Sequence, residues 1–126
     1  MSKEVWGRKY KNFIIMSDYR VHEEVVKILG NRIFDNCSLL DIACGEGALS
    51  QRIKDKFPDC QIDVNDKYAS KIKFKESKHI YNNDLDKFNG MEFNKKYDVI
   101  IAVEVIEHLQ NPWSFLKGLK KYLKED

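Results

Sequence analysis

The stretch Ser38–Ser50, SLLDIACGEGALS, decides the fold because a strand, a glycine-containing turn and a helix start follow one another within it. The apolar run over 38–42 predicts a buried strand with Asp41 near its end. Gly45 and Gly47 allow the backbone to bend tightly beside a ligand. The N–H groups at the start of the following helix are free to point at that ligand. The stretch therefore predicts a nucleotide-type binding site.

Strands and helices alternate along the rest of the chain. Apolar runs predict further strands over 61–65, 79–81 and 97–103. Helical periodicity predicts helices over 18–29, 48–57 and 69–74, and another that starts at Pro112 behind the N-cap Asn111. This order is typical of an α/β fold with a doubly wound parallel sheet and helices on both faces. Ligands of such sheets bind beyond the carboxyl ends of the strands.

The first residues of the chain show a weaker pattern. Trp6, Tyr10, Phe13 and Ile14 fall at helical spacing, so residues 1–17 are interpreted as an N-terminal arm or short helix. Residues 18–126 then form the core of a single domain that spans 1–126, a length that supports one modest hydrophobic core.

Composition narrows the setting. The 22 basic and 20 acidic side chains give a net charge of +2, which does not indicate a nucleic-acid partner. Cys37, Cys44 and Cys60 form no CxxC pair, so we expect neither a disulfide framework nor a zinc ribbon, and a cytoplasmic setting fits best. The longest aliphatic run, 99–103, is too short to span a bilayer, and no membrane partner is expected.

Two acids follow predicted strands at the edge where a ligand would bind. Asp66 follows the strand over 61–65, where a carboxylate can accept hydrogen bonds from ribose hydroxyls. Asp84 follows the strand over 79–81 and could accept from an adenine amino group. The alternatives are a solvated turn residue for Asp66 and an Asx turn over 82–84.

The glycine turn limits which nucleotide could bind. The dinucleotide fingerprint G-x-G-x-x-G requires a third glycine at the position of Ser50, and the P-loop pattern GxxxxGK[ST] does not occur. An acid-rich site suits a nucleoside with a cationic group better than one with a pyrophosphate. A nicotinamide oxidoreductase is therefore disfavoured.

Four segments resemble the class I S-adenosylmethionine-dependent methyltransferases, and especially the ubiquinone-biosynthesis O-methyltransferase branch. They are SLLDIACGEG, Asp66, NDL at 83–85, and YDVIIAVEVIEHLQNPWSFLKGLKKYL at 97–123. The resemblance covers residues 18–124 and implies a Rossmann-like fold, S-adenosylmethionine as cofactor and methyltransferase activity. The acceptor it implies is a small molecule, methylated at oxygen.

The resemblance also implies cofactor-binding residues. The methionine part would lie against Asp41, Ala43, Gly45 and Gly47, although relatives usually have glycine in place of Ala43. The remaining cofactor contacts are Asp66 on the ribose, Asp84 and Leu85 on the adenine, Val103 near the amino group, and Arg20 on the carboxylate.

Glu104, Glu107 and His108 are the candidate catalytic residues. At i, i+3 and i+4 they would share one face if Glu104 opens a helical turn. His108 could then act as general base. Alternatively, the three could supply part of a divalent metal site, or Glu107 and His108 could stabilise the segment before Pro112.

The resemblance further implies that the chain holds the first four strands of the fold, in the order 3-2-1-4. The strand over 98–103 would then be an uncovered edge with the composition of a central strand, which invites pairing with another chain. We expect a homodimer or a partner subunit at this edge. The alternative to an enzyme is a non-catalytic, methyltransferase-like binding or interaction subunit.

Overall fold

A four-stranded parallel sheet forms the centre of the structure, a computed structural model that describes residues 9–15, 18–33, 35–90 and 92–125. Its strands are β3 (Ser38–Asp41), β4 (Gln61–Asn65), β5 (Ile80–Tyr81) and β6 (Val99–Ile101), in the spatial order β5-β4-β3-β6. This order confirms the predicted 3-2-1-4 arrangement of a Rossmann-like sheet.

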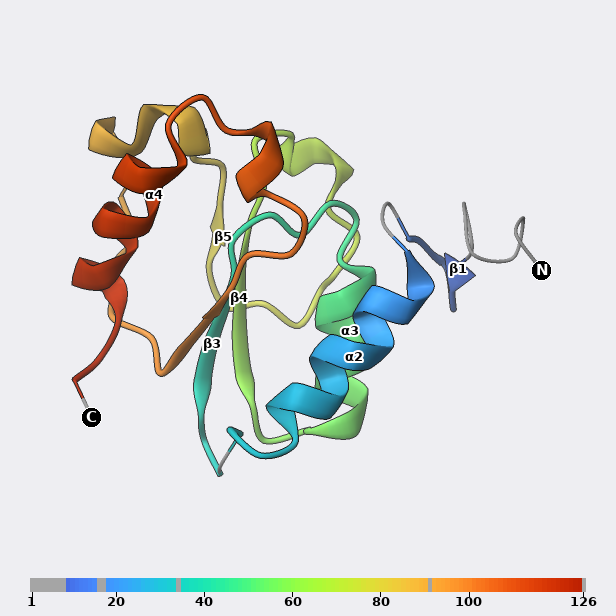
Figure 1. Ribbon diagram of the computed structural model, residues 1–126. Helices are drawn as coiled ribbons and strands as arrows, with labels where there is room; N and C mark the ends of the chain where they lie inside the picture. Colours follow the sequence, from blue (N-terminus) through green and yellow to red (C-terminus); the bar gives the residue numbers. More distant parts are fainter. Residues whose placement is uncertain (1–8, 16–17, 34, 91, 126) are drawn as a thin grey trace.

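Helices cover both faces of the sheet, as predicted (Figure 1). Helices α2 (Tyr19–Leu29) and α3 (Ala48–Lys56) pack on one face and α4 (Pro112–Leu119) packs on the other. Asp18 caps α2, since its side chain accepts from the Arg20 N–H at 2.8 Å, and Asn111 caps α4 by accepting from the Ser114 N–H at 3.1 Å. The caps that the sequence contains therefore start two helices.

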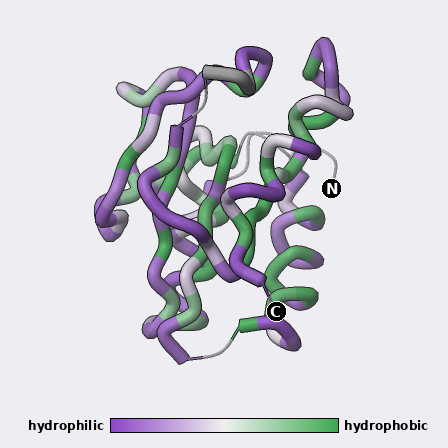
Figure 2. The backbone as a smooth tube through the Cα atoms, turned by 90° about the vertical axis from the view of Figure 1, so that its left-hand side faces the viewer, coloured by the Kyte–Doolittle hydropathy of each residue, from purple (hydrophilic) through white to green (hydrophobic). Residues whose placement is uncertain are grey.

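The alternation of side chains along β3 creates two hydrophobic cores. Leu39 points to the core shared with α2 and α3, and Leu40 points to the core shared with α4. Both leucines are fully buried, and each such side chain contributes roughly 1.5–3 kcal/mol. Figure 2 shows hydrophobic and hydrophilic residues alternating along the strands and helices.

The connection from β4 to β5 differs from the expected helix over 69–74. It contains only the 3₁₀ helix η1 (Ala69–Lys71), after which the backbone is irregular. Phe74 is 1% exposed and packs in the core with α2 and α3. The connection is therefore anchored to the core by this side chain, without a regular helix. The remaining 3₁₀ segments are η2 (Leu85–Gly90), η3 (Ile106–His108) and η4 (Lys120–Tyr122).

The N-terminal segment is a β-hairpin, so the short-helix interpretation is wrong for its described residues. Strands β1 (Lys9–Tyr10) and β2 (Phe13–Ile14) pair antiparallel around a tight turn in which Lys11 has φ 52°. Phe13 is buried in the core with α2 and α3, which holds the hairpin against the domain. Trp6, the other aromatic residue of the predicted face, lies outside the described residues.

The outer edge of β6 is covered at one end only. Tyr97 and Leu123 form an isolated parallel bridge, in which the Tyr97 N–H donates to the Tyr122 carbonyl at 2.7 Å. This bridge lies just before the edge over 98–103 that was expected to be uncovered. Across the described ranges, β6 itself pairs only with β3.

Every helix in those same ranges is too short or too polar to cross a lipid bilayer.

Candidate cofactor and active site

A pocket of about 680 Å³ opens at the carboxyl ends of β3, β4 and β6. This volume lies within the usual range for small-molecule sites. Seven predicted residues line it: Asp41, Ala43, Gly45, Asp66, Val103, Glu104 and His108. Five predicted residues do not: Arg20, Gly47, Asp84, Leu85 and Glu107. Ten lining residues had not been predicted: Ile14, His22, Cys44, Glu46, Ala48, Leu49, Tyr68, Ser70, Lys71 and Lys73.

Asp41 is a buried carboxylate at the floor of the pocket. Its side chain is held by Ser50, whose Oγ–H donates to Asp41 Oδ2 at 2.7 Å. Burial raises the pKa of Asp41 to about 6, while hydrogen bonds from Ser50 and the Ala43 N–H oppose that shift. Ser50, the residue that breaks the dinucleotide fingerprint, therefore fixes an acid of the site.

The glycine turn has the backbone conformation that its sequence predicts. Gly45 has φ 58° and Gly47 has φ 105°, both in the left-handed region that side chains disfavour. A Cβ at Gly47 would lie 2.5 Å from Phe74 Cβ. Gly47 is not among the residues that line the pocket. Its lack of a side chain allows the turn to pack against Phe74.

Asp66 connects the end of β4 to the glycine turn. Its Oδ2 accepts from the Gly45 N–H at 2.8 Å, and its Oδ1 accepts from the Tyr68 N–H at 2.8 Å. Each carboxylate oxygen keeps a second lone pair for a ligand hydroxyl. Asp66 is thus a half-buried acceptor in the pocket lining, and its contact with the Tyr68 N–H is at the same time a turn contact.

Asp84 and Leu85 lie beside the pocket, outside its lining. Asp84 Oδ1 accepts from the Asp86 N–H at 3.0 Å, which is an Asx-turn contact over 84–86 rather than over the 82–84 of the alternative interpretation. The neighbouring Asn65 is fully buried, and its side-chain amide donates to the carbonyls of Ile42 at 2.8 Å and Asn83 at 3.2 Å. Asn65 therefore joins the ends of three strands behind the site.

The segment after β6 does not have the expected helical geometry. Glu104 lies in a turn with φ 54°, and the 3₁₀ helix η3 begins only at Ile106. Glu104 and His108 consequently line the pocket, whereas Glu107 is exposed outside it. The expectation that all three share one helical face is wrong, because the left-handed residue interrupts the helical path. Among the described residues, no three His, Cys, Asp or Glu side chains are grouped to hold a metal ion.

Helix α2 contributes a histidine that the sequence interpretation missed. Arg20 is exposed and pairs with Asp18, with Arg20 Nη2 at 2.9 Å from Asp18 Oδ2. His22, two residues later, is buried and lines the pocket. Burial, and secondarily the Arg52 guanidinium, lower the pKa of His22 to about 4, so its ring is neutral at pH 7. Its spacing of four residues from the buried Val26 is the signal that could have placed it on the inner face.

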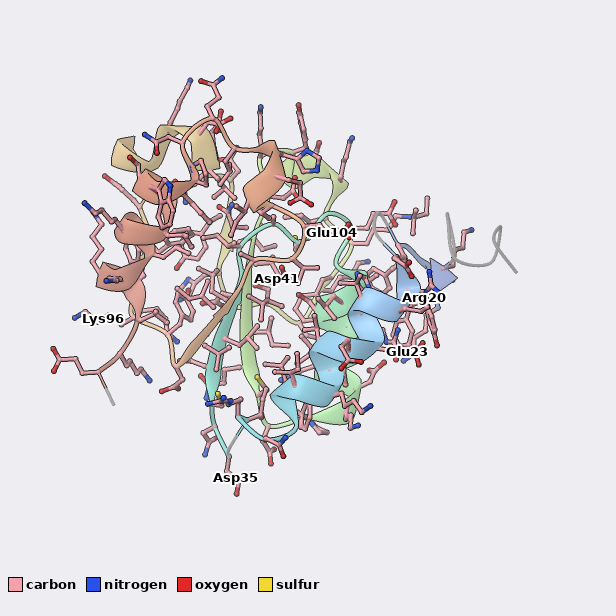
Figure 3. The ribbon with its side chains drawn as sticks, viewed as in Figure 1. Arg20, Glu23, Asp35, Asp41, Lys96 and Glu104 are labelled. Atoms are coloured by element: carbon pink, nitrogen blue, oxygen red, sulfur yellow. The ribbon has the colours of Figure 1, made fainter. Side chains whose placement is uncertain are left out.

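Figure 3 shows these placements. Asp41 and Glu104 lie at the same end of the sheet, while Asp35 marks the opposite end and Arg20 and Glu23 lie on α2 away from the sheet.

Cys44 follows Asp41 in the turn and lines the pocket, and burial raises the pKa of its thiol. A thiol in that environment stays protonated at neutral pH and is a weak nucleophile.

Comparison with known proteins agrees with this geometry. A family described as methyltransferase domain matches residues 40–126. The (S)-tetrahydroprotoberberine N-methyltransferase of Eschscholzia californica is 32% identical over 105 residues, covering 75% of this chain and 29% of the relative. The ubiquinone biosynthesis O-methyltransferase of Pelagibacter ubique is 30% identical over 119 residues, covering 84% of this chain and 47% of the relative.

A solved structure supports the fold. The crystal structure of a coclaurine N-methyltransferase bound to N-methylheliamine and SAH superimposes with a TM-score of 0.68 at 20% identity, covering 83% of this chain and 34% of that one. The chain therefore belongs to the methyltransferase domain family, and its resemblance to S-adenosylmethionine-dependent methyltransferases is confirmed. It spans less than half the length of the curated relatives described above.

Proposed function

We propose that this chain binds S-adenosylmethionine and forms the cofactor-binding part of a methyltransferase that acts on a small-molecule acceptor. The observation that carries the proposal is the Asp66 carboxylate, which is bonded to the Gly45 N–H at 2.8 Å in the wall of the pocket. The family membership supports the same function.

The residues present fit the proposed cofactor. The pocket combines the carboxylates of Asp41, Asp66 and Glu104 with an apolar wall that includes Ala48 and Leu49. Carboxylates suit a ligand that carries an ammonium and a sulfonium group, and the apolar wall suits a nucleoside base. When bound, the cofactor supplies an electrophilic methyl group on sulfur.

Each residue then has a stated role in the proposal. Asp66 binds the ribose hydroxyls. Asp84 and the Leu85 N–H, which lie outside the lining, bind the adenine where it extends beyond the pocket. Asp41, Ala43, Gly45 and Val103 surround the methionine part, while Gly47 shapes the turn. Arg20 binds the cofactor carboxylate only if its ion pair with Asp18 is exchanged.

The proposed chemistry at the acceptor depends on alignment and on removal of one proton. His108 accepts the proton of the acceptor, and Glu104, in the same pocket, stabilises the resulting imidazolium. Glu107 is exposed outside the lining and has no part in this proton transfer. Because the reaction is a direct displacement at the methyl carbon, it requires no covalent enzyme intermediate.

Oxygen is the acceptor atom that we propose, because a hydroxyl needs a base such as His108 for efficient methylation. Nitrogen is the second candidate, and the similarity to (S)-tetrahydroprotoberberine N-methyltransferase favours it. Product masses from matched phenol and amine panels with labelled S-adenosylmethionine would separate the two.

Calorimetric titration with S-adenosylhomocysteine tests the first step. We expect binding by the wild-type chain and at least tenfold weaker binding by Asp66→Ala, since that change removes the carboxylate acceptor. If the wild-type chain gives no binding heat with S-adenosylmethionine or with S-adenosylhomocysteine, the proposal is wrong. Binding without turnover on any acceptor would favour a non-catalytic binding module instead.

The edge of β6 completes the proposal. Val99 and Ile100 are half-buried although their strand pairs on one side only within the described residues. We propose that a further strand, from a second copy or a partner subunit, pairs here. Sedimentation at micromolar concentration would show an assembly; a stable monomer that does not aggregate would contradict it.

A further inference from the structure

Glu46 lies in the glycine turn and lines the pocket, yet neither the family resemblance nor the proposed chemistry gives it a role. Its carboxylate makes two contacts to other segments. Oε1 accepts from the Ile14 N–H of β2 at 2.8 Å and lies 3.2 Å from Lys73 Nζ. Only 16% of the Glu46 side chain is exposed, which limits competition from water at these contacts.

The main chain of Glu46 binds the connection between β4 and β5 as well. Its carbonyl oxygen accepts from the Lys73 N–H at 2.7 Å and from the Phe74 N–H at 3.1 Å. The next residue, Gly47, packs directly against Phe74. One turn residue therefore joins the hairpin, the glycine turn and the β4–β5 connection.

These three segments supply separate walls of one pocket. Ile14 comes from the hairpin, Gly45 from the turn and Lys73 from the connection, and all three are lining residues. Two further polar contacts of the hairpin lie on α3: Tyr10 donates to Asp55 at 2.5 Å, and Lys11 Nζ lies 2.7 Å from the same carboxylate. Asp55 is not a lining residue, whereas Glu46 lines the pocket and bonds the hairpin there, in addition to the apolar contact that the buried Phe13 makes with the core.

We propose that Glu46 is a positioning residue that holds β2 and the β4–β5 connection in place as walls of the cofactor pocket. A carboxylate suits this role because its two oxygens accept from several donors at once. The ion pair with Lys73 keeps it charged, and the Ile14 N–H and Lys73 together lower the pKa of Glu46. For its ligand, the proposal rests on the function proposed above.

Amide hydrogen exchange of the full chain without ligand tests the positioning directly. Glu46→Ala should speed exchange at Ile14 about tenfold or more, since a hydrogen bond to a charged group is lost. Glu46→Gln keeps an acceptor oxygen and Lys73→Met keeps the carboxylate, so both should leave Ile14 within about threefold of wild type. The matched control is Glu23→Ala, on the exposed face of α2. Equal exchange at Ile14 in Glu46→Ala and Glu23→Ala overturns the proposal.

Affinity for S-adenosylhomocysteine tests the consequence for the pocket. Glu46→Ala should raise the Kd about tenfold while its Tm stays near that of Glu23→Ala, and Glu46→Gln should recover most of the affinity. A purely structural role would move Tm and Kd together. If wild type binds and Glu46→Ala binds equally well, the positioning role is wrong. If wild type does not bind, the proposed function fails, and the exchange experiment still decides whether Glu46 holds the walls.

Discussion

The turns after β3 and β6 lie at the carboxyl ends of adjacent strands and line the same pocket, but they are built differently. The turn after β3 is held by side chains from elsewhere, including Asp66 on the Gly45 N–H and Ser50 on Asp41. In the turn after β6, the side chains of Glu104, Glu107 and His108 make no hydrogen bond or ion pair with any described residue.

This difference indicates that the two turns have different roles: the turn after β3 shapes the cofactor site, and the turn after β6 presents side chains to a ligand. Polar groups that are satisfied within the protein fix the shape of the cofactor site before any ligand arrives. Glu104 and His108 are exposed to solvent and have no side-chain partner among the described residues, so they remain available to a ligand. Substitutions after β3 should therefore change stability and cofactor affinity, while substitutions of Glu104 and His108 after β6 should change ligand affinity or turnover with little effect on stability.

The largest effect is expected from Gly47→Ala. The new Cβ would need both a left-handed backbone and space that Phe74 occupies, 2.5 Å away. The free energy of unfolding should fall by about 2–4 kcal/mol. Gly30→Ala is the control, because Gly30 has φ −54° and an alanine there should change stability by less than about 1 kcal/mol. Urea unfolding measures both, and equal losses would refute the role of Gly47.

Asp41→Asn should stabilise the protein in a pH-dependent way. Because burial raises the folded-state pKa of Asp41 to about 6, the stability present below its unfolded pKa is lost as the pH rises through 6. A shift of about two units corresponds to about 3 kcal/mol, which sets the largest possible gain at pH 7. The gain should disappear below pH 4, and its persistence there would show that charge burial is not the cause. Cofactor affinity should fall at the same time.

Asp66→Ala should cost about 1–2 kcal/mol of stability, because the Gly45 N–H loses its acceptor. Asp66→Asn keeps one acceptor oxygen and should lose less. Asp59→Ala, an exposed acid after α3, should leave both stability and S-adenosylhomocysteine affinity unchanged. Thermal unfolding and calorimetry on the three variants would expose any general charge effect.

Glu104→Ala and His108→Ala should have the smallest effect on stability, within about 0.5 kcal/mol, because neither side chain has a partner to lose among the described residues. Turnover should nevertheless fall by about a hundredfold or more for His108→Ala if it is the general base. Unchanged turnover in both variants would remove the catalytic half of the comparison.

The sequence predicted the sheet well because its strands are short buried runs between clear turn signals. The strand over 61–65 has the predicted bounds, and the strands beginning at Ser38 and ending at Tyr81 are each one residue shorter than expected. The strand expected over 97–103 is limited to Val99–Ile101. The acids at the strand ends were found for the same reason, because a parallel sheet brings its carboxyl ends together.

The remaining features depend on tertiary contacts that leave no local pattern. Nothing in the sequence VEVIEH predicts that the backbone of Glu104 adopts a left-handed conformation, since glutamate rarely does so. The hairpin of residues 9–14 is stabilised by Glu46 and Asp55, far away in sequence. The role of His22 depends on its burial against the pocket, which a lone histidine in a helical pattern does not indicate.

The two N–H groups bonded to Asp66 also bear on the thermodynamics of binding. They fix the rotamer of the carboxylate before a ribose arrives, with both contacts at 2.8 Å. Ligand binding therefore does not have to order this side chain, which for a flexible side chain costs roughly 0.5–1.5 kcal/mol of binding free energy. The preorganised acid should make nucleoside recognition less entropically unfavourable than the same contact from a mobile surface aspartate.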